Sequence, residues 1–164
     1  MKKNILFIGG STGIGFETIK LIHNEHNVFV ASRSDESFSE LNITHIKYDI
    51  LSDDFNNELV PEKLHGFVYC PGSINLRPFR SIKSTTFEED LNINFISMVK
   101  TLQKVINNLK KSENSSIVLY STVAVKVGMP FHTSVSASKG AIEGFARSLA
   151  AEYAPIVRVN VIAP

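Results

Sequence analysis

The sequence predicts an α/β protein built on a doubly wound parallel sheet, with about six strands and helices on both faces. Along its 164 residues, short apolar runs alternate with longer stretches of helical periodicity. Most of the runs are unbroken rather than alternating, which is typical of strands buried on both faces. Because a helix between two strands returns the chain to the same end of the sheet, this alternation favours parallel strands.

Six segments have the length and the apolar character of such strands. No internal repeat, low-complexity tract or linker separates them into groups. We therefore expect a single domain over residues 1–164. In chain order the predicted strands are NILFI at 4–8, NVFVA at 27–31, HIKYD at 45–49, GFVYC at 66–70, SIVLYS at 116–121 and VRVNVIA at 157–163.

Helical patterns occupy four of the intervals between these strands, at 13–24, 52–60, 85–111 and 134–154. The third is the longest, and Thr85 with Glu88 has the spacing of a capping box. Its main apolar stripe has spacings of three and four residues and consists of Phe87, Leu91, Phe95, Met98, Leu102, Val105 and Leu109.

Additional apolar residues on this long helix lie off the main stripe. They are Ile96, Val99 and Ile106, and they either widen the face towards the core or pack against another subunit. The helix at 134–154 has a surface rich in Ala and Gly. We expect these two helices to pair between copies of the chain, giving a homodimer or a higher homo-oligomer.

Composition excludes several classes of partner. Lys and Arg number 17 against 16 Asp and Glu, so neither a nucleic acid nor an acidic membrane surface is an expected partner. No apolar run approaches the ~18 residues of a membrane helix. The single cysteine, Cys70, excludes an internal disulfide and fits a reducing compartment. The predicted location is the cytoplasm.

The first predicted strand leads directly into the glycine-rich sequence GGSTGIG, ahead of an amphipathic helix. Gly9, Gly13 and Gly15 allow a tight turn that brings backbone N–H groups close to a phosphate at the helix N-terminus. An ordinary glycine-rich turn is the alternative. Three spaced glycines after the first strand of an α/β pattern favour a dinucleotide-binding, Rossmann-like domain.

The end of the second strand indicates which dinucleotide is bound. In such folds an acidic residue at this place binds the ribose 2′-hydroxyl, but here the sequence is Ala31-Ser32-Arg33-Ser34. A guanidinium at Arg33 can pair with a 2′-phosphate, although a solvated surface arginine is the alternative. The predicted cofactor is therefore NADP(H).

Together these residues resemble the short-chain dehydrogenase/reductase family. The family motif Thr-Gly-x-x-x-Gly-x-Gly appears as IGGSTGIG, with Ile8 in place of Thr, and Asn-Asn-Ala-Gly appears as YCPG, residues 69–72. Asp49 matches the acidic residue that contacts adenine. The resemblance implies cofactor binding by Gly9, Ser11, Thr12, Gly13, Ile14, Gly15, Ser32, Arg33, Asp49, Ile50, Cys70, Gly72 and Lys139.

The resemblance also implies an active site. Asn94 matches the helix asparagine of the family, and Lys139 matches the lysine of its Tyr-x-x-x-Lys pair. Ser121 or Thr122 would bind the carbonyl oxygen. In the family the Tyr donates the proton, but four residues before Lys139 this chain has a valine, which cannot. His132 is the nearest titratable side chain and is either a substitute acid or a residue without a role.

The chain ends at Pro164, where the family normally continues through a substrate-covering segment and a seventh strand. We therefore expect a sheet without the usual C-terminal strand, in a domain that is either truncated or complete in this form. Two functions remain open. One is an NADP(H)-dependent oxidoreductase acting on a small carbonyl or alcohol. The other is a non-catalytic relative that binds a nucleotide or oligomerises.

Overall fold

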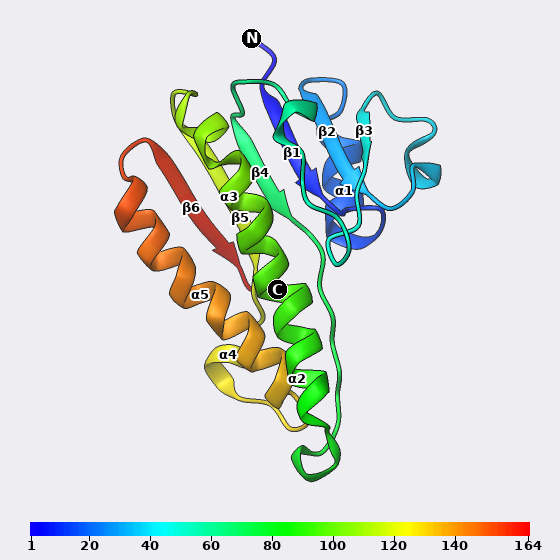
Figure 1. Ribbon diagram of the computed structural model, residues 1–164, viewed down its shortest axis with the longest axis vertical. Coiled ribbons are helices and arrows are strands. Elements are labelled where there is room, and N and C mark those ends of the chain that lie inside the picture. Colours follow the sequence, from blue (N-terminus) through cyan, green and yellow to red (C-terminus); the bar gives the residue numbers. More distant parts are fainter.

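Six parallel strands form one sheet in the computed structural model, which describes residues 1–164. The strand order is β3-β2-β1-β4-β5-β6, so all carboxyl ends meet at one edge, at the lower end of the sheet in Figure 1. The predicted parallel α/β sheet is confirmed. Its strands are β1 (Asn4–Ile8), β2 (Asn27–Ser32), β3 (Thr44–Lys47), β4 (Gly66–Tyr69), β5 (Ser115–Tyr120) and β6 (Val157–Ile162).

Helices cover both faces of this sheet (Figure 1). One face carries α1, and the other carries α3 and α5, with α2 leading into α3 and the short α4 preceding α5. None of these helices has the length and apolar character that a membrane span requires. Their bounds are α1 (Gly13–Ile22), α2 (Ser84–Leu91), α3 (Ser97–Lys110), α4 (Ala124–Val127) and α5 (Thr133–Tyr153).

Alternate residues of the strands enter two different cores. On the α1 face, Phe7 of β1 packs in a cluster with Ile19 of α1 and Phe38 of a single helical turn. On the other face, Leu6 and Ile8 belong to a larger cluster. Because neighbouring residues of a strand point to opposite faces, burial on both sides requires the unbroken apolar runs seen in the sequence.

The helix predicted at 52–60 is wrong. This segment contains only a 3₁₀ turn at Asn57–Leu59. Its Asp and Asn side chains bind local backbone groups instead: Asp53 Oδ2 accepts a hydrogen bond from Asp49 N at 2.7 Å, and Asn56 Oδ1 accepts from Glu58 N at 3.0 Å. Such local bonds compete with helical ones, so the segment forms turns.

The long predicted helix at 85–111 exists but differs in two details. It begins at Ser84, and Lys83 precedes it without any side-chain capping bond, so the predicted Thr85–Glu88 capping box is wrong. It is also interrupted by a π-helical turn at Asn92–Ile96, between α2 and α3. The extra residue of a π turn shifts the register of the following helix and commonly marks a functional site.

Candidate active site

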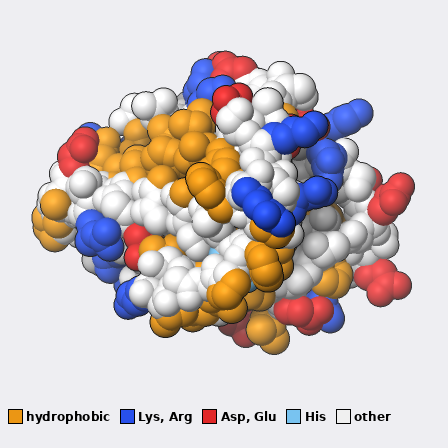
Figure 2. All heavy atoms as spheres, turned by 90° about the horizontal axis from the view of Figure 1, so that it is seen from below, with side chains coloured by type: hydrophobic (Ala, Val, Ile, Leu, Met, Phe, Trp, Pro, Cys, Tyr) orange, Lys and Arg blue, Asp and Glu red, His pale blue; other side chains and the backbone are white.

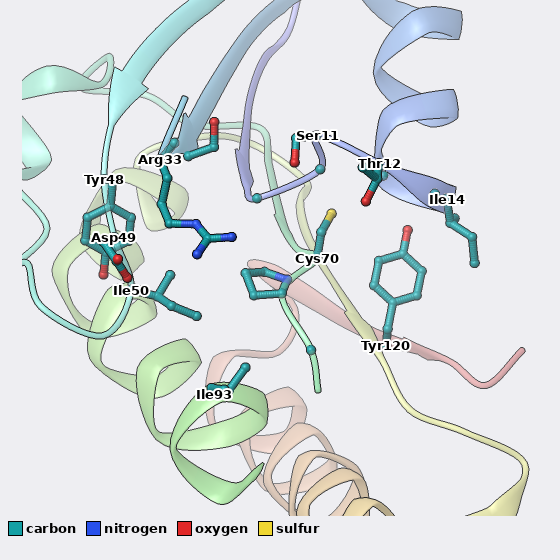
Figure 3. Close-up of a pocket in the computed structure, with 18 of the residues that line it drawn as sticks. Ser11, Thr12, Ile14, Arg33, Tyr48, Asp49, Ile50, Cys70, Ile93 and Tyr120 are labelled. Atoms are coloured by element: carbon teal, nitrogen blue, oxygen red, sulfur yellow. The ribbon is translucent and has the colours of Figure 1, made fainter. Parts of the chain in front are cut away.

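A cavity of about 600 Å³ opens at the carboxyl edge of the sheet, where β1 meets β4 (Figure 3). The winding of the chain reverses between these two strands, and ligands of open α/β sheets bind at such a switch point. Segments 9–15, 31–34, 48–51 and 70–72 line the cavity, together with Ile93, Tyr120 and Pro164. Twelve of the predicted cofactor residues lie within these segments: Gly9, Ser11, Thr12, Gly13, Ile14, Gly15, Ser32, Arg33, Asp49, Ile50, Cys70 and Gly72.

The glycine-rich turn needs glycine for two different reasons. Gly13 has a φ of 60° with open space around it, so its backbone conformation alone favours glycine. Gly15 is enclosed, because an added Cβ would lie 2.7 Å from Cys70 Sγ and 2.8 Å from Gly10 Cα. The turn thereby brings the start of α1 against the end of β4.

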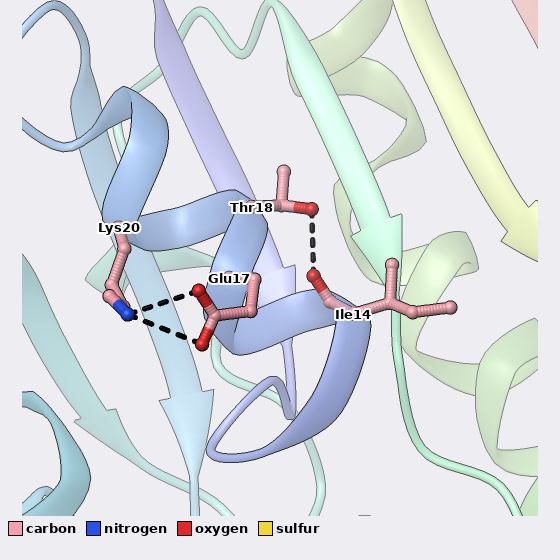
Figure 4. A network of polar contacts seen from close by, with 4 residues as sticks. All are labelled: Ile14, Glu17, Thr18 and Lys20. Carbon is pink, nitrogen blue, oxygen red and sulfur yellow. Dashed lines mark hydrogen bonds and ion pairs between the residues drawn. The ribbon is translucent and has the colours of Figure 1, made fainter.

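The first turn of α1 is left available to an anionic ligand. The side chain of Thr12, which precedes the helix, makes no capping hydrogen bond. Further along, Thr18 Oγ1 donates to the Ile14 carbonyl at 2.7 Å, and Lys20 pairs with Glu17 at 3.0 Å (Figure 4). This exposed ion pair stabilises the helix only slightly, and the free backbone N–H groups face the cavity edge that a phosphate would occupy.

Arg33 extends from the end of β2 towards the cavity (Figure 3). It forms none of the four ion pairs in the structure. Its neighbour Ser32 is buried and donates a hydrogen bond to the Ser34 carbonyl at 2.8 Å. The guanidinium is therefore a free positive charge at the edge of the cavity, on a backbone that is locally fixed.

Lys139 extends from α5 to Gly72, a residue of the cavity wall, although Lys139 itself does not line the cavity. Its Nζ lies 3.4 Å from the position that a Cβ on Gly72 would take. Burial lowers the pKa of Lys139 to about 8. The thiol of Cys70 is also buried, and burial raises its pKa to about 12. The cysteine is thus neutral at physiological pH and offers no counter-charge to the lysine.

Asn94 lies within the π turn and is fully buried. Its Oδ1 accepts a hydrogen bond from Ser73 N at 3.1 Å, and its Nδ2 donates to Ser138 Oγ at 3.0 Å. Asn94 therefore connects the segment after β4 to the residue next to Lys139. Tyr69 of β4 contacts the π turn, because its hydroxyl donates a hydrogen bond to the Ile93 carbonyl at 2.7 Å.

The two candidate hydroxyls at the end of β5 differ in their surroundings. Ser121 is buried, and its Oγ donates to Glu143 Oε1 at 2.6 Å. Thr122 is half-buried, and its Oγ1 accepts a weak bond from Ala124 N at 3.3 Å. The Thr122 hydroxyl still has its proton to donate, whereas the Ser121 proton is already used.

Val135 stands where the resemblance implies the proton-donating Tyr, and this position is apolar and buried. Val135 is 4% exposed on α5. His132 precedes this helix, half-buried, with Nδ1 at 2.7 Å from the Pro130 carbonyl. That contact requires a proton on Nδ1 and leaves Nε2 as the free nitrogen. Neither residue lines the cavity, and the other candidate active-site residues, Asn94, Ser121, Thr122 and Lys139, do not line it either.

Sequence reasoning missed a buried carboxylate in this region. Asp90 is fully buried and accepts hydrogen bonds from Ser73 Oγ at 2.5 Å, Asn75 Nδ2 at 2.8 Å and Ser134 Oγ at 2.6 Å. A signal was present, because buried polar residues recur at helical spacing beside the apolar stripe of α2 and α3. They are Asp90, Asn94, Ser97 and Thr101.

Comparison with known proteins gives a consistent result. The family profile described as short chain dehydrogenase matches residues 3–164. A 2,5-dichloro-2,5-cyclohexadiene-1,4-diol dehydrogenase from Sphingobium indicum is 26% identical over 178 residues, which cover 99% of this chain and 71% of that protein. A cyclopentanol dehydrogenase from a Comamonas species is 26% identical over 179 residues, covering 99% and 72%.

The fold is shared with solved structures. ElxO with NADP bound superposes with a TM-score of 0.88 at 24% sequence identity, covering 100% of this chain and 73% of that one. A similarity at this level of identity establishes the fold. The cavity at the switch point lies where this fold binds its dinucleotide.

Proposed function

Since the chain belongs to the short-chain dehydrogenase/reductase family, we propose that it is an NADP(H)-dependent oxidoreductase that interconverts a carbonyl and an alcohol on a small molecule. The observation that carries this proposal is the convergence of Asn94 and Lys139 on Gly72. A Cβ at Gly72 would lie 3.1 Å from Asn94 Oδ1 and 3.4 Å from Lys139 Nζ. A glycine here lets both side chains approach the backbone of the cavity wall closely, because a larger residue would crowd them.

Each part of the cavity has a role in this proposal. The turn at 9–15 holds the pyrophosphate through backbone N–H groups, and Arg33 pairs with the 2′-phosphate. Asp49 and Ile50 border the adenine. Lys139 binds the nicotinamide ribose. The bound cofactor supplies or accepts the hydride.

In this proposal the hydroxyl of Thr122 activates the substrate carbonyl. Ser121 is the poorer candidate because its proton is donated to Glu143, whereas Thr122 can donate to a carbonyl oxygen and stabilise the developing negative charge. The proton that completes reduction comes from water or from His132, since Val135 has none to give.

A second candidate function is nucleotide binding without turnover. The apolar burial of Val135, at 4% exposed, favours it, because the family's proton donor stands at that position. Fluorescence titration with NADPH, run beside NADPH oxidation against a panel of carbonyl compounds, separates the two functions. Binding with turnover supports the enzyme, binding without turnover supports the second candidate, and absence of binding contradicts both.

Cofactor choice is tested at Arg33. We expect NADPH to bind about ten- to a hundredfold more tightly than NADH, because a charge-assisted contact contributes roughly 1.5–3 kcal/mol. Arg33→Ala should remove this preference by weakening NADPH alone, while Arg158→Ala on β6 serves as the matched control. Fluorescence titrations of both cofactors measure the effect. Equal affinities in the wild-type protein would refute the assignment.

A further inference from the structure

Two loops extend from the candidate active site and meet away from it. The first, residues 73–83, follows Gly72. The second, residues 123–132, follows Thr122, includes the short helix α4 and leads into α5. They are joined where Arg77 N donates a hydrogen bond to the Phe131 carbonyl at 3.2 Å. Because each segment follows a residue of the candidate site and the two meet, they form one continuous surface, here called the mouth surface, at the lower end of the molecule in Figure 1. None of their residues lines the cavity itself.

This mouth surface exposes large apolar side chains. The first loop contributes Ile74, Leu76 and Phe79, at 63%, 50% and 72% exposed, and the second contributes Val127 and Phe131, at 71% and 54%. Figure 2 shows hydrophobic side chains gathered in broad areas on the face that contains this end. Exposed apolar surface of this extent marks a place where another apolar group binds.

The backbone at Phe131 is part of this arrangement. Phe131 has a φ of 70°, in the left-handed region that bulky residues rarely adopt. The hydrogen bond from Arg77 N to its carbonyl joins the two loops at this residue. Together they place an aromatic ring in solvent rather than in the core.

The same surface is positively charged. The two loops carry Arg77, Arg80, Lys83 and Lys126 and contain no Asp or Glu. None of these four cations takes part in an ion pair. The neighbouring helix α2 carries Glu88 and Glu89, both exposed, beyond Phe87, which packs on Phe79. The four cations of the two segments therefore outnumber the nearby exposed carboxylates and favour an anion on this surface.

We propose that the mouth binds an amphipathic anion: a substrate whose reacting carbonyl lies near Thr122, with an apolar chain against Leu76, Phe79 and Phe131 and an anionic end group at Arg77 and Arg80. This inference rests on the proposed function and names its substrate class. Apolar contact supplies most of the affinity, and the cations select the charged end.

Charge complementarity argues for this occupant over a second copy of the chain. Isologous pairing of this surface would bring two sets of four unpaired cations together, and like charges in contact oppose association. Continuity with the site argues for a substrate over an anionic membrane, because the first segment follows Gly72, beside Asn94 and Lys139, and the second follows Thr122, the proposed carbonyl donor.

Isothermal titration with octanoate and with octan-1-ol tests the inference, in the presence and absence of NADPH. We expect octanoate to bind roughly tenfold more tightly than the alcohol. In Arg77→Gln/Arg80→Gln this preference should disappear, with octan-1-ol binding unchanged. Lys2→Gln/Lys3→Gln removes two charges at the opposite end of the molecule and should preserve the preference.

Each other outcome overturns the inference. It fails if the two ligands bind equally, or if the preference persists in the double variant. Co-sedimentation with phosphatidylglycerol vesicles without any octanoate preference would assign the surface to a membrane. A lower mass of Phe79→Ser in light scattering, with octanoate binding unchanged, would assign it to a second copy. The titrations without NADPH remain decisive even if cofactor binding, and with it the proposed function, fails.

Discussion

Lys139 is the residue whose environment departs most from that of an ordinary surface lysine. It lies half-buried beside Gly72, and burial lowers its pKa to about 8. No carboxylate pairs with it in the structure. A poorly solvated cation gains more from a bound ligand than a hydrated one does, because the ligand replaces lost water contacts. The free protein therefore bears a cost at this position that a ribose hydroxyl can offset.

The pH dependence of stability should report this cost. The pKa of Lys139 falls from 10.5 to about 8 on folding, so below pH 8 the protein carries the full cost of the buried charge, at most about 3 kcal/mol. Between pH 8 and 10.5 the unfolded chain binds more protons, and the cost declines. Urea unfolding without cofactor should show Lys139→Met to be more stable than wild type at pH 7, with a difference that shrinks by pH 10. A constant difference would contradict the assigned pKa.

A second prediction at the residue scale concerns the missing phenol. If Val135 marks a lost proton donor, Val135→Tyr should raise carbonyl reduction by roughly 10²–10⁴-fold, the usual contribution of a positioned acid. If His132 is the acid, His132→Ala should abolish wild-type turnover and Val135→Tyr should change it little. Steady-state NADPH oxidation measures both effects. If neither Val135→Tyr nor His132→Ala changed the wild-type activity, the proton would be assigned to water.

Single residues were predictable where the sequence spacing itself carries the chemistry. Arg33 stands at a fixed separation from the glycine turn and lines the cavity, whereas Lys139, identified through the resemblance, lies beside Gly72 of the cavity wall. Asp90 and Glu143 were missed because their partners, Ser134 and Ser121, are 44 and 22 residues away. Which polar groups meet across such separations depends on packing that local patterns do not contain.

At the scale of elements, predictability followed the strength of the apolar pattern. All six strands were predicted within two residues of their observed bounds, because burial on both faces leaves a clear signal. The segment at 52–60 has only Phe55 and Val60 buried, and its Asp and Asn residues decide its turns. The π turn was unpredictable for a different reason: its contact with the Tyr69 hydroxyl of β4 joins residues 24 positions apart.

The contact between the Tyr69 hydroxyl and the π turn provides a prediction at the scale of elements. Tyr69 donates to the Ile93 carbonyl inside the π turn, so Tyr69→Phe removes this partly buried hydrogen bond and should cost about 0.5–1.5 kcal/mol. The π turn should also relax towards a regular helix and move Asn94. Tyr153→Phe, at the end of α5 and without a hydroxyl partner, is the matched control. Urea unfolding and NADPH affinity measure the two effects, and a variant as stable as this control would exclude the proposed role.

The whole molecule combines a cavity at one edge of the sheet with an unpartnered outer surface on α3 and α5. Phe95 of the π turn and Phe145 of α5 pack edge to face with ring centroids 5.7 Å apart. Small residues follow along α5 at helical spacing, and three of them, Ala137, Gly144 and Ser148, are exposed. Small side chains allow two helices to approach closely, so this surface suits pairing with a second copy.

We therefore expect a dimer at micromolar concentration through α3 and α5, formed about a twofold axis. Gly144 has open space around it, since an added Cβ would meet nothing within 4 Å, so Gly144→Arg should leave the fold intact and place a charge in the interface. Light scattering should show a dimer for the wild-type protein and a monomer for this variant. Leu21→Arg, at a side chain 79% exposed on α1 across the sheet, should remain dimeric. A wild-type monomer would refute the pairing, and dissociation by Leu21→Arg instead would place the interface on the α1 face.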